Sequence, residues 1–334
     1  MSGPSFPTPS FIDSGGVQLA VYEAGAPSQM PPLVFCHGFP DIAYTWRNQF
    51  AGLSARGFRT LALDQRGYGA SDRPTAVEAY DMAALTGDLI ALLDARGIER
   101  AVFVGHDWGG LIVWQMPLRH PDRVAGIIAL NTPYTKKPPI DPIALYRKRF
   151  GEQFYIVRFN TDDSADRAFE ADVGRTLRFF LRRPAAEQPA GDGRAGADML
   201  AALAAYGDDA DDAPLLTPDE LAIYVAAFNR TGFTPAINWY RNFTRNWEHA
   251  PETPDFVPHP ALMIMAGRDA VLPPSATDGM EKYVPNLEKR LIAQSGHWTQ
   301  QEHPETVNAF IADWMTRTFG PDGPQGLAAG AVDP

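Results

Sequence analysis

The sequence predicts an α/β protein with a mostly parallel central sheet flanked by helices. Short apolar runs alternate with longer amphipathic stretches over most of the 334 residues, a spacing typical of such sheets. Several of the runs are apolar almost throughout, as strands covered on both faces must be. The alternation stops between about residues 131 and 258, which predicts an all-helical insertion in the sheet domain.

Seven apolar, β-branched runs are the expected strands. In chain order they are residues 17–22, 33–36, 58–63, 101–104, 126–130, 261–266 and 289–293.

Three amphipathic stretches are the expected helices of the sheet domain. The first, 81–96, has Asp81 as its cap and ends at Gly97. The second, 111–118, follows a buried strand directly. The third, 304–319, begins with a proline, which suits a first helical turn, and carries one apolar face.

The insertion contains helix-like stretches at 142–154, 218–229 and 235–247, and an Ala/Asp/Gly-rich piece, 185–212, that we expect to be a mobile loop. We therefore divide the chain into four parts: the first part of the sheet core (1–133), a helical cap (134–257), the second part of the core (258–320) and a flexible C-terminal tail (321–334).

The composition argues against several classes of partner. The chain has 29 Lys and Arg against 40 Asp and Glu, a net charge of −11, which disfavours binding to nucleic acid or to a membrane surface. Its one cysteine, Cys36, excludes an internal disulfide framework. We see no metal-ligand spacing and no Gly-rich phosphate or dinucleotide loop, so we expect no metal and no cofactor.

The N-terminal residues have neither a basic region nor an apolar core, and the longest apolar runs are too short to cross a bilayer. These features favour the cytoplasm. The sequence leaves the oligomeric state open, with a homodimer among the options.

The main chemical signal is a strand that turns sharply into a helix. Residues 105–109 read Gly-His-Asp-Trp-Gly, the Gly-x-nucleophile-x-Gly pattern, with Asp107 at its centre. The two glycines allow close contact between strand and helix, so the central side chain stands at the carboxyl end of the sheet. An aspartate can displace a leaving group at saturated carbon and form an ester, whereas attack on an acyl group would give an unstable anhydride.

Other residues suit the hydrolysis of such an ester. The amides of Trp108 and of Phe39, in a His-Gly-Phe-Pro turn, are candidates for an oxyanion hole. Asp269 and His297 follow two late strands, and the order nucleophile, acid, histidine is that of known hydrolases on α/β sheets. His297 would activate water, and Asp269 would orient its imidazole.

These motifs resemble the soluble-type epoxide hydrolases of the α/β-hydrolase fold. The resemblance rests on His-Gly-Phe-Pro at 37–40, Asp-Gln-Arg-Gly-Tyr-Gly-Ala-Ser at 64–71, the 105–110 elbow, Gly-Arg-Asp at 267–269 and Gly-His-Trp at 296–298. It implies an α/β-hydrolase fold with a helical cap, a small hydrophobic epoxide as substrate and a vicinal diol as product.

The resemblance also maps the two ring-opening tyrosines of the family onto Tyr155 and Tyr240. The residues alone do not choose them, because the insertion also contains Tyr146, Tyr206 and Tyr224. The segment after the first tyrosine departs from the family pattern, reading Phe-Asn-Thr-Asp at 159–162, which bears on substrate preference and not on the reaction.

Two other functions remain open at this point. A haloalkane dehalogenase shares the aspartate elbow, but commonly has an Asn after the His-Gly pair, where Phe39 stands here. A non-catalytic receptor could keep the scaffold and bind a small molecule without turnover.

Overall fold

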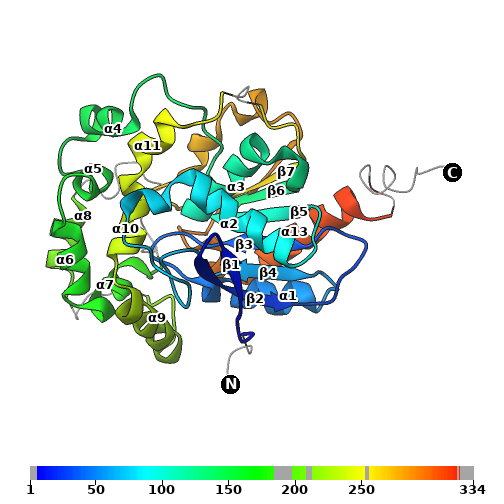
Figure 1. The fold of residues 1–334 in the computed structure, drawn as a ribbon, viewed down its shortest axis with the longest axis horizontal. Helices are drawn as coiled ribbons and strands as arrows, with labels where there is room; N and C mark the ends of the chain where they lie inside the picture. The colour runs from blue at the N-terminus through cyan, green and yellow to red at the C-terminus, as the bar shows by residue number, and fades with distance from the viewer. Residues whose placement is uncertain (1–5, 184–197, 208–212, 253–255, 322, 324–334) are drawn as a thin grey trace.

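An eight-stranded sheet forms the centre of the computed structural model, which describes residues 6–183, 198–207, 213–252, 256–321 and 323 (Figure 1). The strand order is β1-β2-β4-β3-β5-β6-β7-β8, with β1 and β2 antiparallel to their neighbours and the rest parallel. The strands are β1 (Ser10–Ser14), β2 (Val17–Ala24), β3 (Leu33–Cys36), β4 (Thr60–Leu63), β5 (Ala101–His106), β6 (Val124–Leu130), β7 (Ala261–Ala266) and β8 (Leu287–Ile292).

The predicted α/β class is confirmed, because helices cover both faces of this sheet. Strands β3 to β6 are buried along their whole length. Helices α2 (Met82–Ala95) and α3 (Trp108–Arg119) pack on one face, while α1 (Arg47–Ser54) and α13 (Pro304–Phe319) pack on the other. Asp81 caps α2, as predicted, by accepting a hydrogen bond from Ala84 N.

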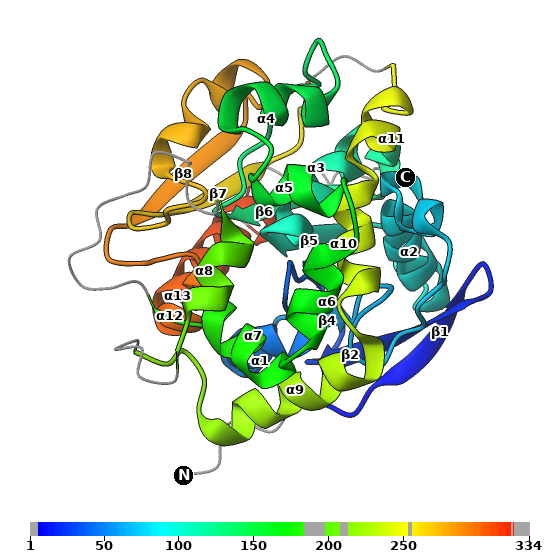
Figure 2. The ribbon, with the colours of Figure 1, turned by 90° about the vertical axis from the view of Figure 1, so that its left-hand side faces the viewer.

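The chain between β6 and β7 is helical and lies to one side of the sheet (Figures 1 and 2). Its helices are α4 (Pro142–Phe150), α5 (Tyr155–Phe159), α6 (Ser164–Glu170), α7 (Val173–Phe180), α8 (Met199–Ala205), α9 (Pro218–Thr231), α10 (Thr234–Arg241) and α11 (Phe243–Glu248). The described part of this segment contains one isolated β-bridge, between Arg182 and Pro214. The division into core and cap at 134 and 257 remains our proposal.

Polar contacts tie the helical segment to the sheet domain. Glu220 accepts a hydrogen bond from Arg47 at 2.7 Å, and the Tyr224 hydroxyl donates to Asp41 at 2.8 Å. The second pair is fully buried, and burial raises the pKa of Asp41 to about 7. Helix α9, which carries both partners, is therefore held close over the core.

The seven predicted strands are all present, with ends shifted by two residues or fewer. Strand β1 was not predicted, because its half-exposed residues show only a weak apolar pattern. The helix predicted over 142–154 ends at Phe150, since Gly151 adopts a φ of 89°. The helix predicted over 235–247 is broken at Asn242, whose side chain donates to the carbonyls of Val77 and Asn238.

The prediction of a mobile loop over 185–212 is wrong for the part that the structure describes, because helix α8 forms there. Asp198 caps this helix by accepting from Ala201 N, and the buried Leu203 packs into the core. The other residues of that loop, and nearly all of the predicted tail 321–334, lie outside the described residues.

Candidate active site

Asp107 stands at the turn between β5 and α3, with φ 53° and ψ −121°. A positive φ is uncommon for a residue with a side chain and is found at strained functional turns. A Cβ added to Gly105 would lie 2.2 Å from Gly109 O, and one added to Gly109 would lie 2.0 Å from Cys36 O. The two glycines therefore permit the turn that places Asp107 at the carboxyl end of the sheet.

Replacement of Gly109 by alanine should destabilise the protein, because its Cβ would collide with a buried backbone carbonyl. We expect the free energy of unfolding to fall by about 3 kcal/mol, the upper end for overpacked cores. Gly87→Ala, within α2, is the matched control, because its Cβ would meet no described atom within 4 Å. Thermal unfolding should show a lower Tm for Gly109→Ala and an equal or higher Tm for Gly87→Ala; equal loss in both would contradict this account.

The Asp107 carboxylate lies beside the two amides that the sequence predicted as oxyanion donors. Phe39 N–H donates to Asp107 Oδ1 at 2.8 Å, and the Trp108 amide beside the carboxyl helps to lower its pKa. Burial nevertheless raises the pKa of Asp107 above its usual value, although the two amides and the charge of His297 oppose the rise. Because Oδ1 is held by Phe39, Oδ2 is the oxygen available for other contacts.

His297 connects Asp107 to Asp269, as the residue order predicted. His297 Nδ1 lies 2.9 Å from Asp269 Oδ2, and its Nε2 lies 3.8 Å from Asp107 Oδ2. Burial alone would lower the pKa of His297, but the charge and hydrogen bond of Asp269 and the charge of Asp107 outweigh it and raise the pKa to about 9. Burial likewise opposes ionisation of Asp269, but His297 holds the pKa of this carboxyl well below its usual range.

Two further side chains hold the His297 loop, and the sequence analysis did not identify this role for either. Asn131 Nδ2 donates to Asp269 Oδ2 at 2.7 Å and to His297 O at 3.0 Å. Glu302 accepts hydrogen bonds from Gly296 N at 2.8 Å and Trp298 N at 2.9 Å, the amides on either side of His297. A Thr-x-x-Glu pattern at 299–302, which often marks a helix start, was the available signal for Glu302.

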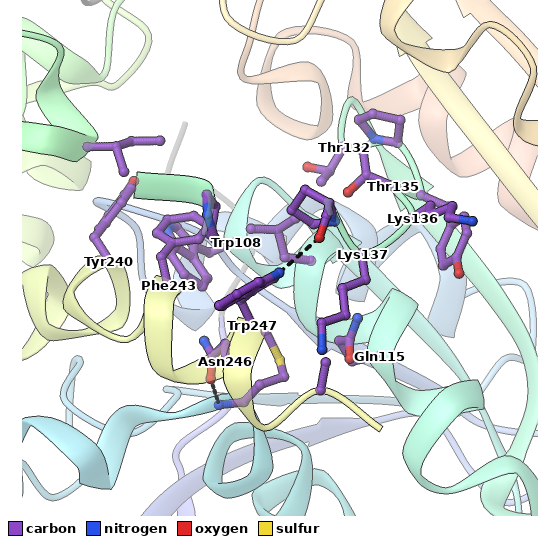
Figure 3. Close-up of a pocket in the computed structure, with 18 of the residues that line it drawn as sticks. Trp108, Gln115, Thr132, Thr135, Lys136, Lys137, Tyr240, Phe243, Asn246 and Trp247 are labelled. Carbon is purple, nitrogen blue, oxygen red and sulfur yellow. Dashed lines mark hydrogen bonds between the residues drawn. The ribbon is translucent and has the colours of Figure 1, made fainter. Parts of the chain in front are cut away.

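Tyr155 and Tyr240 line the same cavity as Asp107, with their ring centroids 5.8 Å apart. The cavity has a volume of about 430 Å³ and lies between α3, the chain after β6 and helices α4, α5, α10 and α11 (Figure 3). Burial, followed by the charge of Asp107, raises the pKa of both tyrosines above the ordinary value, so both remain neutral phenols. Tyr146 also lines the cavity, whereas Tyr224 is engaged by Asp41.

Three other buried polar residues support the turns around the site. His106 is buried, and its Nε2 lies 2.7 Å from His297 O; burial, followed by the charge of His297, lowers its pKa to about 3. His37 supports its own turn, because its Nε2 accepts from Gln65 N. Asp64 accepts hydrogen bonds from the amides of Ala43 and Ala70, as a structural residue of the turns.

The described residues also lack the features of two other kinds of site. They contain no helix with the length and apolar character that crossing a bilayer requires. Nor do they contain three or more His, Cys, Asp or Glu side chains arranged to hold a metal ion.

Comparisons with known proteins show the family of the chain. Residues 31–304 match the family model described as the alpha/beta hydrolase fold. Epoxide hydrolase A of Mycobacterium tuberculosis is 42% identical over 318 residues, covering 93% of this chain and 98% of the relative. Bifunctional epoxide hydrolase 2 of Mus musculus is 36% identical over 90% of this chain, which spans only 54% of that longer protein.

Solved structures show the same similarity. The crystal structure of epoxide hydrolase A from Mycobacterium thermoresistibile has a TM-score of 0.81 and 37% identity, covering 92% of this chain and 98% of that one. Epoxide hydrolase I of potato has a TM-score of 0.80 and 30% identity over the same shares of the two chains.

Proposed function

The chain belongs to the α/β-hydrolase family and, within it, to the epoxide hydrolases, and from this premise we propose a mechanism in which an epoxide and water become a vicinal diol through an ester on Asp107. The observation that carries the proposal is the arrangement around one carboxylate. The Phe39 amide binds Asp107, His297 faces its Oδ2 at 3.8 Å, and two phenols line the same cavity.

In the first step Asp107 Oδ2 attacks an oxirane carbon. A bond forms between that carbon and Oδ2 while the bond from the carbon to the ring oxygen breaks. Tyr155 and Tyr240 hydrogen bond the ring oxygen, and one of them transfers its proton to the developing alkoxide. Their raised pKa values keep both as neutral donors until that alkoxide, a strong base, is formed.

In the second step His297 takes a proton from water, and the hydroxide adds to Cγ of Asp107. The negative charge then develops on Oδ1, where the amides of Phe39 and Trp108 stabilise it. The bond between Cγ and Oδ2 breaks, so that Oδ2 leaves with the diol, and the leaving alkoxide takes the proton from His297. The remaining carboxyl proton returns to the tyrosinate, which restores the starting state.

Ester formation also prepares His297 for its role. The charge of Asp107 is one of the interactions that raise the pKa of His297 to about 9, so the free enzyme holds a protonated imidazole at neutral pH. Alkylation neutralises Asp107 and removes that interaction. The pKa of His297 therefore falls, its proton passes to solvent, and the neutral base becomes available when the ester needs hydrolysis. His297 takes a proton up again when the Asp107 carboxylate is regenerated.

The dehalogenase alternative is less well supported. Its halide would require polar N–H donors in the cavity, whereas Phe39 presents a ring that packs against Tyr240 at 5.3 Å. The named relatives are epoxide hydrolases. Parallel assays should therefore detect diol from epoxides and no halide from haloalkanes.

Isotope incorporation tests the ester step. After many turnovers in ¹⁸O-water, mass spectrometry of the peptide containing Asp107 should show solvent oxygen in that carboxylate, because water attacks Cγ. The same incubation without epoxide is the control. Turnover that leaves this peptide unlabelled would contradict the covalent mechanism, since direct attack of water on the epoxide would label only the diol.

Glu302→Gln should weaken the hydrolytic step, because Glu302 binds both amides beside His297 and its charge raises the pKa of that imidazole. We expect the pKa of His297, followed by NMR in the free enzyme, to drop below its value of about 9. In each enzyme the imidazole is protonated below the pKa of His297 and neutral above it. Because this pKa is lower in the variant, His297 becomes neutral at a lower pH in the variant than in the parent. We also expect kcat to fall about tenfold, a fraction of the 10²–10⁴-fold that a general base supplies.

Glu305→Gln is the matched control, because it removes the same charge from an exposed position three residues away. It should leave both the pKa of His297 and kcat near their parental values. An unchanged pKa in Glu302→Gln would show that the residue has no electrostatic effect on His297.

A further inference from the structure

Two residues with strained backbones end neighbouring strands at the active site. Asp107 and Asn131 have φ values of 53° and 63°, and they are the two non-glycine residues with positive φ in the part of the chain that the structure describes. Asp107 follows β5, and Asn131 follows its parallel neighbour β6. Such strain persists where the surrounding structure enforces it, and it concentrates at functional sites. The strain at Asp107 belongs to the nucleophile turn, so the strain at Asn131 needs an explanation of its own.

The turn at Asn131 is very tight. Thr132 N–H donates to Leu130 O at 2.7 Å, which closes a turn of three residues with Asn131 at its centre. A three-residue turn with positive φ is rare because it is strained. Asparagine adopts positive φ more readily than most residues that carry a side chain. The backbone at this point therefore has little freedom to change the direction of the Asn131 side chain.

The Asn131 side chain is buried among groups that bind both of its polar atoms. Its Nδ2 donates to Asp269 Oδ2 at 2.7 Å and to His297 O at 3.0 Å. Its Oδ1 accepts a hydrogen bond from Thr299 Oγ1 at 2.7 Å. Because only 1% of Asn131 is exposed, water does not compete for these contacts. One amide therefore holds the acid and the loop of the base together.

The contact with Asp269 is made at the oxygen that faces the base. Oδ1 of Asp269 is bound separately, by Val271 N at 2.8 Å and Leu272 N at 3.0 Å. Among the described residues, the groups that hydrogen bond to Oδ2 are the Asn131 amide and His297 Nδ1. The position of Oδ2 relative to the imidazole therefore depends on Asn131.

The same turn is attached to the nucleophile. Thr132, which lines the cavity (Figure 3), donates from its Oγ1 to Asp107 O at 2.8 Å. Trp114 Nε1, on α3, donates to Thr132 O at 3.0 Å. A Cβ added to Gly110 would lie 2.4 Å from Thr132 Cβ, so Thr132 also packs tightly against the first turn of α3. A movement of this turn would therefore change how His297 faces Asp107.

We propose that Asn131 is a positioning residue for ester hydrolysis, which sets the Asp269–His297 pair in place relative to the nucleophile. Asn131 is not among the residues that line the cavity, so it acts through Asp269 and His297. The role rests on the proposed function, because it serves the hydrolysis of an ester on Asp107. A displacement of a catalytic group by about 1 Å can cost about 10²-fold in rate, so a residue that never meets the substrate can control this step.

Asn131→Gly tests the role, because glycine tolerates the positive φ and the substitution removes the amide. We expect the pKa of His297, followed by NMR in the free enzyme, to fall below about 9, since Asp269 Oδ2 is no longer held against the imidazole. In a single turnover with enzyme in excess, quenched in acid and followed by intact-protein mass spectrometry, the ester on Asp107 should form at close to the parental rate. It should then decay about tenfold more slowly.

Variants of Thr299 change the same amide from its other side. Thr299→Val removes the donor to Asn131 Oδ1, so we expect the pKa of His297 to fall in the same direction as in Asn131→Gly, but by less. Thr299→Ser keeps a hydroxyl and should restore the parental pKa. A merely structural role would not make the pKa follow the presence of this hydroxyl.

Two further variants are controls. Thr132→Val cuts the link of the turn to Asp107 O, and it should slow ester formation while leaving the pKa of His297 at about 9. Thr86→Val removes another buried threonine hydroxyl, which donates to Met82 O within α2. It should leave both the pKa of His297 and the decay of the ester unchanged.

The pKa measurement needs no substrate, so it separates this proposal from the proposed function. An unchanged or raised pKa of His297 in Asn131→Gly, or equal decay of the ester in variant and parent, would overturn the role of Asn131. Absence of any ester in the parent enzyme would instead contradict the proposed function, and the pKa of His297 would still decide whether Asn131 positions the pair.

Discussion

Replacement of His297 by glutamine is expected to stop diol release and to leave the substrate covalently attached to Asp107. The first step needs only the Asp107 carboxylate and the tyrosines, so the ester still forms. The second needs a base at the position of His297 Nε2, 3.8 Å from Asp107 Oδ2, and glutamine cannot accept the proton from water. We expect kcat to fall about 10²–10⁴-fold. Intact-protein mass spectrometry should show an increase equal to the substrate mass.

Asp107→Asn/His297→Gln is the control for this experiment, since an amide is a poor nucleophile and should give no adduct. Asp269→Asn provides a graded comparison, because it leaves the imidazole in place but removes the charge that most raises its pKa. It should accumulate the ester more weakly than His297→Gln. Steady diol production by His297→Gln without any adduct would be incompatible with the two-step mechanism.

The sequence predicted the sheet well because burial on both faces leaves a direct trace in composition. Strands such as β5 and β6 are apolar at nearly every position, so they could be predicted from the local sequence without knowledge of distant residues. Strand β1 is half exposed and leaves no such trace. The break between α10 and α11 depends on hydrogen bonds of Asn242, one of them to Val77, 165 positions away, which no local pattern contains.

The same distinction applies to the site. Asp107, Asp269 and His297 could be placed together because each follows a strand of one parallel sheet, and the ends of such strands meet at one edge. Tyr155 and Tyr240 came only from the family resemblance, because local patterns do not separate them from Tyr146. Their meeting depends on how α5 and α10 pack, with ring centroids 5.8 Å apart.

The supporting residues were harder still to predict. The Glu302 side chain bonds amides four and six positions earlier in the chain, a loop geometry that a helix-start pattern does not specify. Asn131 donates to Asp269 and to the carbonyl of His297, which lie 138 and 166 positions away in the chain. These features follow from tertiary packing, and only the structure brings them together.

Removal of both phenols, in Tyr155→Phe/Tyr240→Phe, is expected to slow ring opening severely. Without a donor the ring oxygen must leave as an alkoxide in a buried cavity, where an unpaired charge is strongly disfavoured. Each single variant keeps one donor, so we expect losses in the alkylation rate of about 10–10²-fold for each and about 10³–10⁴-fold for both, in the range of general acid catalysis. Fold and cavity shape should be retained, because phenylalanine keeps the ring contacts.

The decisive measurement is the rate of adduct formation in the His297→Gln background, which isolates the first step. Both tyrosine variants should slow this rate, while in enzyme that retains His297 the hydrolysis of an ester already formed should change little. Tyr146→Phe is the discriminating comparison, since Tyr146 lines the same cavity and the sequence alone could not exclude it. If adduct formation slowed more in Tyr146→Phe than in either of the other two, the donor pair would have to be reassigned, because the phenol nearest the ring oxygen contributes most to its departure.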